Sequence, residues 1–110
     1  MAYDEDLGNR IREHIAHERG LTEKRMFGGL AFMINGHLAV SASSKGGLLL
    51  RVDPAETAAL VSAPHVGRFV MRGREMDGWL RVDPQAFGTD EELDRWVQLG
   101  VRYARSLPAK

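Results

Sequence analysis

Two histidines in the first predicted helix come closest to a metal-binding or catalytic pattern. His14 and His17 are three residues apart, with Glu13 and Glu18 beside them. Residues at this spacing share one face of a helix, and imidazole with carboxylate could bind zinc or nickel. The pattern is neither His-Glu-x-x-His nor its inverse, and no third ligand is evident. A solvated helix face with ion pairs is the better interpretation, so we expect no metal and no cofactor.

Patterns for nucleophilic and phosphate chemistry are also missing from the sequence. No Gly-x-Ser-x-Gly elbow surrounds a serine, and segment 43–47 lacks the spacing of a phosphate-binding loop. Glu75 and Asp77 share a strand face, but arginines on both sides make them ion-pair partners rather than a catalytic pair. The chain has no cysteine, which excludes thiolate sites. We therefore expect a protein that is not an enzyme.

Length and charge predict an ordinary globular protein. The 110 residues correspond to a single domain, 1–110. With 15 basic and 15 acidic residues the formal net charge is zero, which argues against a dedicated nucleic-acid binder. The N-terminus is acidic and unlike a secretory signal, and no stretch approaches the ~18 apolar residues of a spanning helix. We expect a cytoplasmic protein without membrane contact.

The N-terminal part of the sequence predicts a helix followed by two strands. Asp4 is a candidate N-cap, and an apolar residue recurs every four positions until the helix ends near Gly20. An apolar, strand-like run covers 25–34 and contains the pair Gly28-Gly29. Two adjacent glycines in a strand need a reason, such as a bulge or another backbone at close range.

Asn35-Gly36 predicts a hairpin turn between this run and a second strand at 37–43. Two registers are possible for this hairpin. A two-residue turn would place Leu38 opposite Met33, whereas a three-residue loop with a bulge would place Leu38 opposite Phe32. We favour the bulged version because it makes a better apolar face.

The C-terminal part predicts three strands and two helices. A third strand covers 48–53, and Asp53-Pro54-Ala55-Glu56 opens a short helix that runs to about Ser62. Strands at 68–72 and 75–83 flank a turn at Gly73. A capping box, Thr89 to Glu92, then opens the last and longest helix. The order α-β-β-β-α-β-β-α predicts an α+β two-layer sandwich, with a mostly antiparallel five-stranded sheet and helices on one face.

The uncovered face of this sheet is the candidate binding surface. Alternation along the strands puts Arg51, Trp79 and Arg81 on that face, and Phe27 and Met33 join them in the favoured register. Aromatic and arginine side chains together could contact another protein or a second copy, or stack a planar ligand or the bases of a single strand. Alternatively, arginine stems simply shield a half-exposed sheet.

Two motifs resemble the N-terminal domain of the TfoX/Sxy family. The string Arg25-Met26-Phe27-Gly28-Gly29 lies on the first strand, and segment 73–79, Gly-Arg-Glu-Met-Asp-Gly-Trp, resembles the family's segment before its last strand. The likeness runs from about Tyr3 to Leu107 and implies a secretion-chaperone-like α+β fold. It implies structural roles for Met26, Phe27, Gly28, Gly29, Arg74, Gly78 and Trp79.

The resemblance also implies a regulatory role. The family is named after regulators of natural competence, which assist a cyclic-AMP-responsive transcription factor and carry a second, C-terminal domain. This chain ends at Lys110 without such a domain, so we expect a stand-alone module. Its expected partner is a protein, such as a transcription factor, or a second copy in a dimer. The alternative is single-stranded nucleic-acid binding through the open sheet face.

Overall fold

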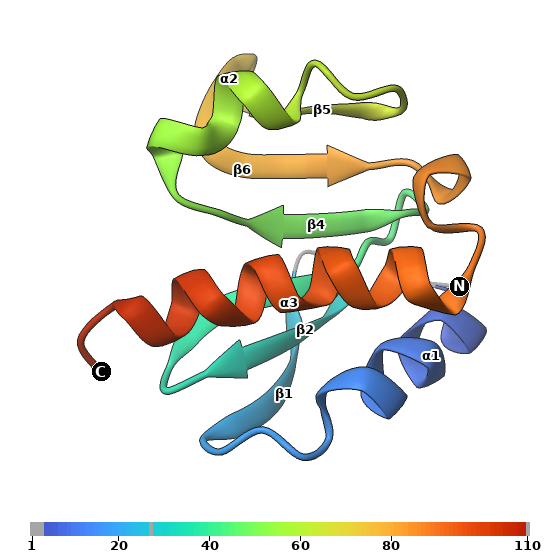
Figure 1. Ribbon diagram of the computed structural model, residues 1–110, viewed down its shortest axis with the longest axis vertical. Coiled ribbons are helices and arrows are strands. Elements are labelled where there is room, and N and C mark those ends of the chain that lie inside the picture. The colour runs from blue at the N-terminus through green and yellow to red at the C-terminus, as the bar shows by residue number, and fades with distance from the viewer. Residues whose placement is uncertain (1–3, 27, 110) are drawn as a thin grey trace.

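The computed structural model describes residues 4–26 and 28–109, and in this part of the chain it has three α-helices and six strands (Figure 1). In chain order the elements are α1 (Glu5–Ile15), β1 (Leu21–Met26), β2 (Gly29–Ile34), β3 (His37–Ala42), β4 (Leu48–Arg51), the 3-10 helix η1 (Pro54–Glu56), α2 (Thr57–Leu60), β5 (Val66–Met71), β6 (Arg74–Val82), the 3-10 helix η2 (Pro84–Phe87) and α3 (Asp90–Ser106). The predicted α+β class is confirmed, with one strand more than expected.

The extra strand arises at the glycine pair. The predicted strand 25–34 is a hairpin of β1 and β2, in which Met26 pairs with Gly29. Gly28 lies between the strands with φ of +77°, a conformation that costs a side-chain-bearing residue free energy. A Cβ atom on Gly29 would collide with the carbonyl oxygen of Ala42 on β3. The glycines therefore permit a turn and a close backbone approach, and the expectation of a single strand was wrong.

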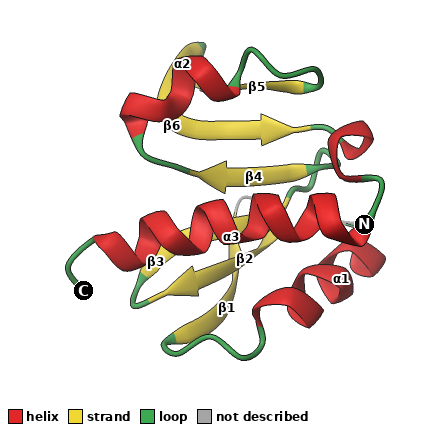
Figure 2. Cartoon of the chain, viewed as in Figure 1, coloured by secondary structure: helices red, strands yellow, loops and turns green. Residues whose placement is uncertain are grey.

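All strand pairs are antiparallel, and the sheet order is β1-β2-β3-β4-β6-β5. The three helices lie on one side of this sheet, with α3 running across its middle (Figure 2). β1 and β5 form the two edges. No helix in the described part of the chain combines the length and the apolar character that crossing a bilayer requires.

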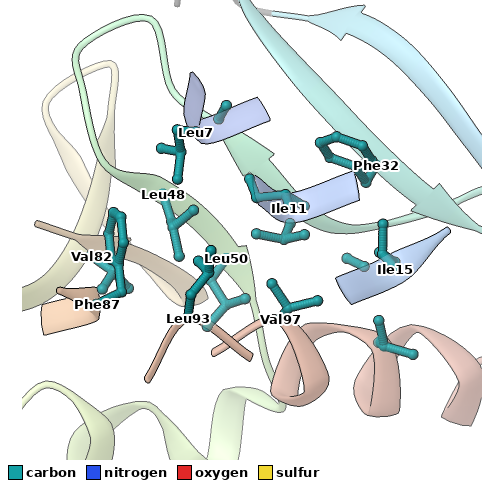
Figure 3. Packing of buried hydrophobic residues seen from close by; sticks show 14 of the residues in the cluster. Leu7, Ile11, Ile15, Phe32, Leu48, Leu50, Val82, Phe87, Leu93 and Val97 are labelled. Carbon is teal, nitrogen blue, oxygen red and sulfur yellow. The ribbon is translucent and has the colours of Figure 1, made fainter. Parts of the chain in front are cut away.

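The main core lies between the sheet and the helices (Figure 3). From α1 it receives Leu7, Ile11 and Ile15, which are buried as the fourfold spacing predicted. α1 ends at Ile15, one turn before the expected end at Gly20. The expected caps are present: the Asp4 side chain accepts hydrogen bonds from the first turn of α1, and α3 has its capping box. Local signals therefore fix where the helices start.

A bulge in β3 changes the register of the hairpin that β2 and β3 form. The turn is the two-residue kind, so Leu38 lies opposite Met33, and the favoured three-residue version was wrong. Between Phe32 and Met33 the pairing shifts, which leaves Ala39 as an extra residue in β3. Ala39 joins the main core, while Leu38 packs on the other face of the sheet. Because Ala39 is an extra residue, Leu38 and Val40 point to opposite faces of the sheet although they are two positions apart in one strand.

α3 rests directly on this bulge. A Cβ atom on Gly100 would collide with the carbonyl oxygen of Ala39 and lie 2.9 Å from Cδ1 of Leu50. Because backbone cannot rotate away as a flexible side chain can, the missing Cβ sets how closely helix and sheet approach. Gly100 is therefore a packing residue of the last helix.

We expect Gly100→Ala to lower the free energy of unfolding. Alanine gains up to ~1 kcal/mol in helix propensity, but overpacking against fixed backbone costs ~1–3 kcal/mol, so the cost prevails. Urea unfolding measures this difference. Gly88→Ala is the control, because φ at Gly88 is −68° and its nearest contact would be Glu92 Oε1 at 3.9 Å. Equal stability of Gly100→Ala and the native chain would contradict the assigned packing.

An ion pair joins α1 to β1, and we expect it to make stability depend on pH. Arg12 donates hydrogen bonds of 2.8 Å from Nε and Nη2 to the two carboxylate oxygens of Glu23, and this bonding lowers the pKa of Glu23. A lowered pKa stabilises the fold above the unfolded value, about 4.3, and this contribution is lost as pH falls through the folded pKa. Glu23→Gln should cost under ~1 kcal/mol at pH 7, since both groups are partly exposed, and less at pH 2, where the carboxylate is protonated more often. Urea unfolding at both pH values measures this, and an equal cost at both would contradict it.

Candidate functional site

A second apolar cluster lies on the sheet face opposite the helices. Ala31, Leu38 and Leu49 are its buried members, and Met26, Phe69 and Trp79 are partly buried against them. Each of the six strands contributes one residue to this set, which we call the open-face cluster. Side chains alternate along β4, which shows that the two clusters lie on opposite faces of the sheet. Leu49 belongs to the open-face cluster, whereas its neighbours in β4 belong to the main core.

The open-face cluster is a shallow layer. Leu38 and Leu49 are each only 5% exposed although no described helix contributes to the cluster. Their cover comes from larger strand side chains, of which Trp79 is half-buried. Met33 is half-buried, and since both its neighbours in β2 belong to the main core, it points to this same face. The sequence expected this face for Met33 from a hairpin register that was wrong. Phe27, the other apolar candidate, lies outside the described residues.

Arg51 connects the open face to the last helix. Its Cζ lies 5.1 Å from the centroid of the Trp79 ring and 5.6 Å from that of Tyr103 on α3. Trp79 and Arg51 are directly paired across β4 and β6, which explains the first contact. Each cation–π contact contributes ~0.5–1 kcal/mol at a partly exposed site. The sequence placed Arg51 and Trp79 on the same face of the sheet but gave no sign of Tyr103, since that contact depends on where α3 crosses the sheet.

One arginine of β5 and one of β6 have carboxylate partners within the chain. Arg81 pairs with Asp83, and Arg68 Nε donates to Asp77 Oδ1 at 2.8 Å, so Asp77 is an ion-pair partner as expected. The Arg81 side chain is nevertheless 51% exposed. An exposed pair of this kind holds its partners only weakly, so Arg81 can exchange one carboxylate for another.

Gly78 anchors β6 beneath the short helix and thereby orients the neighbouring Trp79. Its φ is +85°, and the strand bulges around it. Its N–H donates a 2.7 Å hydrogen bond to Oγ1 of Thr57, which is buried, and its carbonyl oxygen accepts from the N–H of Val52. A Cβ atom here would lie 3.0 Å from Cγ of Pro54. Gly78 therefore shapes this part of β6, and sequence reasoning missed Thr57 because a single threonine gives no signal of its partner.

The rest of this motif forms the last hairpin. Arg74 is the first residue of β6 and pairs with Met71. Between them lie Arg72 and Gly73, with φ of 54° and 78°, the geometry of a tight two-residue hairpin turn. The turn at Gly73 is therefore where the sequence predicted it.

The two histidines of the N-terminal segment contact different carboxylates. Nδ1 of His14 lies 3.3 Å from Oδ1 of Asp94 on α3, and Nε2 of His17 lies 3.1 Å from Oε2 of Glu18. Within residues 4–26 and 28–109 no three potential metal ligands come together. His14 lies on α1, but the helix ends at Ile15, so His17 is in the following turn and the expectation that both histidines share one helix face was wrong.

A pocket of about 400 Å³ lies on the helix side of the molecule. Nε1 of Trp96 at its wall donates a 3.1 Å hydrogen bond to the carbonyl oxygen of Ala86. The lining residues come from α2, the loop after it, η2 and α3: Leu60, Ala63, Pro64, His65, Gln85, Ala86, Glu92, Arg95, Trp96 and Leu99. Met33, Arg51, Trp79 and Arg81, the described residues predicted to bind a partner, are not among them.

Comparison with known proteins gives one match. The model of the TfoX N-terminal domain family matches residues 13–104 of the 110-residue chain, a range that includes both motifs, 25–29 and 73–79. Searches of curated proteins and of solved structures found no match.

We expect Thr57→Val to lower the free energy of unfolding by ~1–3 kcal/mol, because it leaves the buried N–H of Gly78 without an acceptor. Thr57→Ser is the matched control, since it keeps the hydroxyl and removes only a methyl group. Urea unfolding of both variants gives the comparison. If Thr57→Val and Thr57→Ser had the same free energy of unfolding, this hydrogen bond would not be what holds β6 in place.

Proposed function

The chain belongs to the TfoX N-terminal domain family, and we propose that it is a small cytoplasmic module that acts by binding another protein through its open sheet face. One observation carries this proposal. An apolar cluster that takes one residue from each of the six strands has no described helix over it, while the opposite face is packed against three. The partly exposed members of this cluster, Met26, Phe69 and Trp79, form apolar surface of the kind that marks interaction sites.

The chemistry of this face indicates the kind of partner. Trp79 is a partly exposed apolar side chain of the cluster, with Arg51 directly opposite it on β4 and Arg81 two residues later on β6. Met33 is partly exposed too, but it lies three strands away on β2. Tryptophan and arginine are the side chains that most often dominate binding energy at protein interfaces. A partner with an apolar patch flanked by carboxylates would bury the indole and compete with Asp83 for Arg81.

The family suggests what the partner does. Competence regulators that carry this domain assist a transcription factor, so we propose a regulatory role in which the partner is a protein of that class. Binding rather than catalysis is the activity proposed for the candidate residues. A protein partner is favoured over nucleic acid because the formal net charge of the chain is zero, with 15 basic and 15 acidic residues.

Charge reversal and truncation on the open face test the proposal. We expect Trp79→Ala with Arg81→Ala to weaken partner binding at least tenfold, and Arg81→Glu alone to weaken it several-fold. Arg81→Glu disturbs only an exposed ion pair, so its effect on binding is separate from any effect of Trp79 on folding. The measurement is affinity capture with each variant, followed by titration of the captured protein after purification.

The control carries matched changes on the helix side, Glu91→Ala with Arg102→Ala, both at exposed positions of α3. This control should bind as the native chain does. Equal binding by the open-face variants and the control would reject the proposed surface. Binding of single-stranded oligonucleotides that falls steeply with salt and is lost in the same variants would replace a protein partner by nucleic acid.

A further inference from the structure

The two edges of the sheet differ in how they are protected against pairing. β1 presents the charged run Glu23-Lys24-Arg25, the usual means of keeping an edge strand from pairing with another chain. β5 has a single charged residue, Arg68, which pairs with Asp77 of the same hairpin. Val70 on β5 is 55% exposed, the one large apolar side chain of the described residues to reach solvent so fully. The β5 edge is thus open and largely apolar.

The direction of the backbone groups of β5 follows from its hydrogen bonds. The carbonyl oxygen of His65 accepts from the N–H of Asp83 at the end of β6, and Met71 pairs with Arg74 across the two-residue turn. In an antiparallel strand alternate residues bond to the same side, so odd-numbered residues face β6. The N–H and C=O groups of Val66, Arg68 and Val70 therefore face outward from the sheet.

We propose that two copies of this chain form a dimer by pairing their β5 strands antiparallel about a two-fold axis at Phe69. Two pairing registers let the outward-facing N–H and C=O groups of the two β5 strands form hydrogen bonds along most of the strand. A register centred on Arg68 would place two guanidinium groups opposite each other, which is destabilising. A register centred on Phe69 pairs Arg68 with Val70 and places the two Phe69 rings side by side.

The second copy is favoured as the occupant because β5 is complementary to itself. A two-fold interface uses one patch twice and closes, and the charged β1 edge prevents further growth of the sheet. Antiparallel pairing of this kind keeps the helices of both copies on one side. Phe69 belongs to the open-face cluster, so its pairing joins the two clusters into one surface twice as wide. The dimer does not depend on the proposed function.

Sedimentation velocity tests the dimer, with Val70→Lys as the disrupting variant. In the dimer a lysine at this exposed position would lie beside Arg68 of the second copy, and it should not affect folding. Thr22→Lys, on the β1 edge, is the matched control. We expect dimers of the native chain and of Thr22→Lys at ~100 µM, and monomers of Val70→Lys. A monomeric native chain, or a dimer that survives Val70→Lys, would overturn the proposal.

A cysteine cross-link tests the register. The chain has no cysteine, so a single introduced thiol reports on its own position. In the proposed register the two Phe69 residues form a non-hydrogen-bonded pair, with Cα atoms about 4.5 Å apart, within the range of a disulfide. Phe69→Cys should form a covalent dimer on oxidation, and Thr22→Cys should not. Equal cross-linking of both would reject the register. A monomeric native chain that still binds its partner would reject the dimer alone.

Discussion

The close approach of α3 to the bulge in β3 is the contact on which the rest of the structure depends. Gly100 has no Cβ, and only for this reason can the helix lie against the carbonyl group of Ala39. This contact holds the longest helix across the middle of the sheet, and α1 then packs beside it over the main core. Because all three helices lie on this side, the other side of the sheet has no second layer. The open face is thus a direct result of where the helices pack.

The bulge also determines what the open face contains. Without an extra residue at Ala39, Leu38 and Val40 would point to the same side of the sheet. With it, Leu38 joins the open-face cluster and Val40 stays in the main core. Arg51 then links the two layers, since it contacts Trp79 on one side and Tyr103 of α3 on the other. Arg51 is therefore a side chain that contacts both the open face and the last helix.

Much of the fold could be predicted from local signals. The caps at Asp4 and Thr89 start their helices where expected, and the turn at Gly73 forms as predicted. The sequence also placed Trp79 on the open face. It failed where distant parts of the chain decide the outcome. The glycine pair indicated a bulge or a close backbone, and Gly29 does lie against the backbone of β3. The turn at Gly28 was missed, because the apolar run continues through it and only the pairing of β1 with β2 reveals it.

The central claim is that the sheet has a protected face and an accessible one, and solvent accessibility in solution tests it most directly. Relaxation of methyl and indole NMR signals by a soluble gadolinium chelate measures this accessibility residue by residue. The structure predicts strong relaxation for the Met33 methyl and the Trp79 indole, and little for Ile11 and Ile34, which are 0% exposed. Equal protection of all four would contradict the open face and the binding role proposed for it.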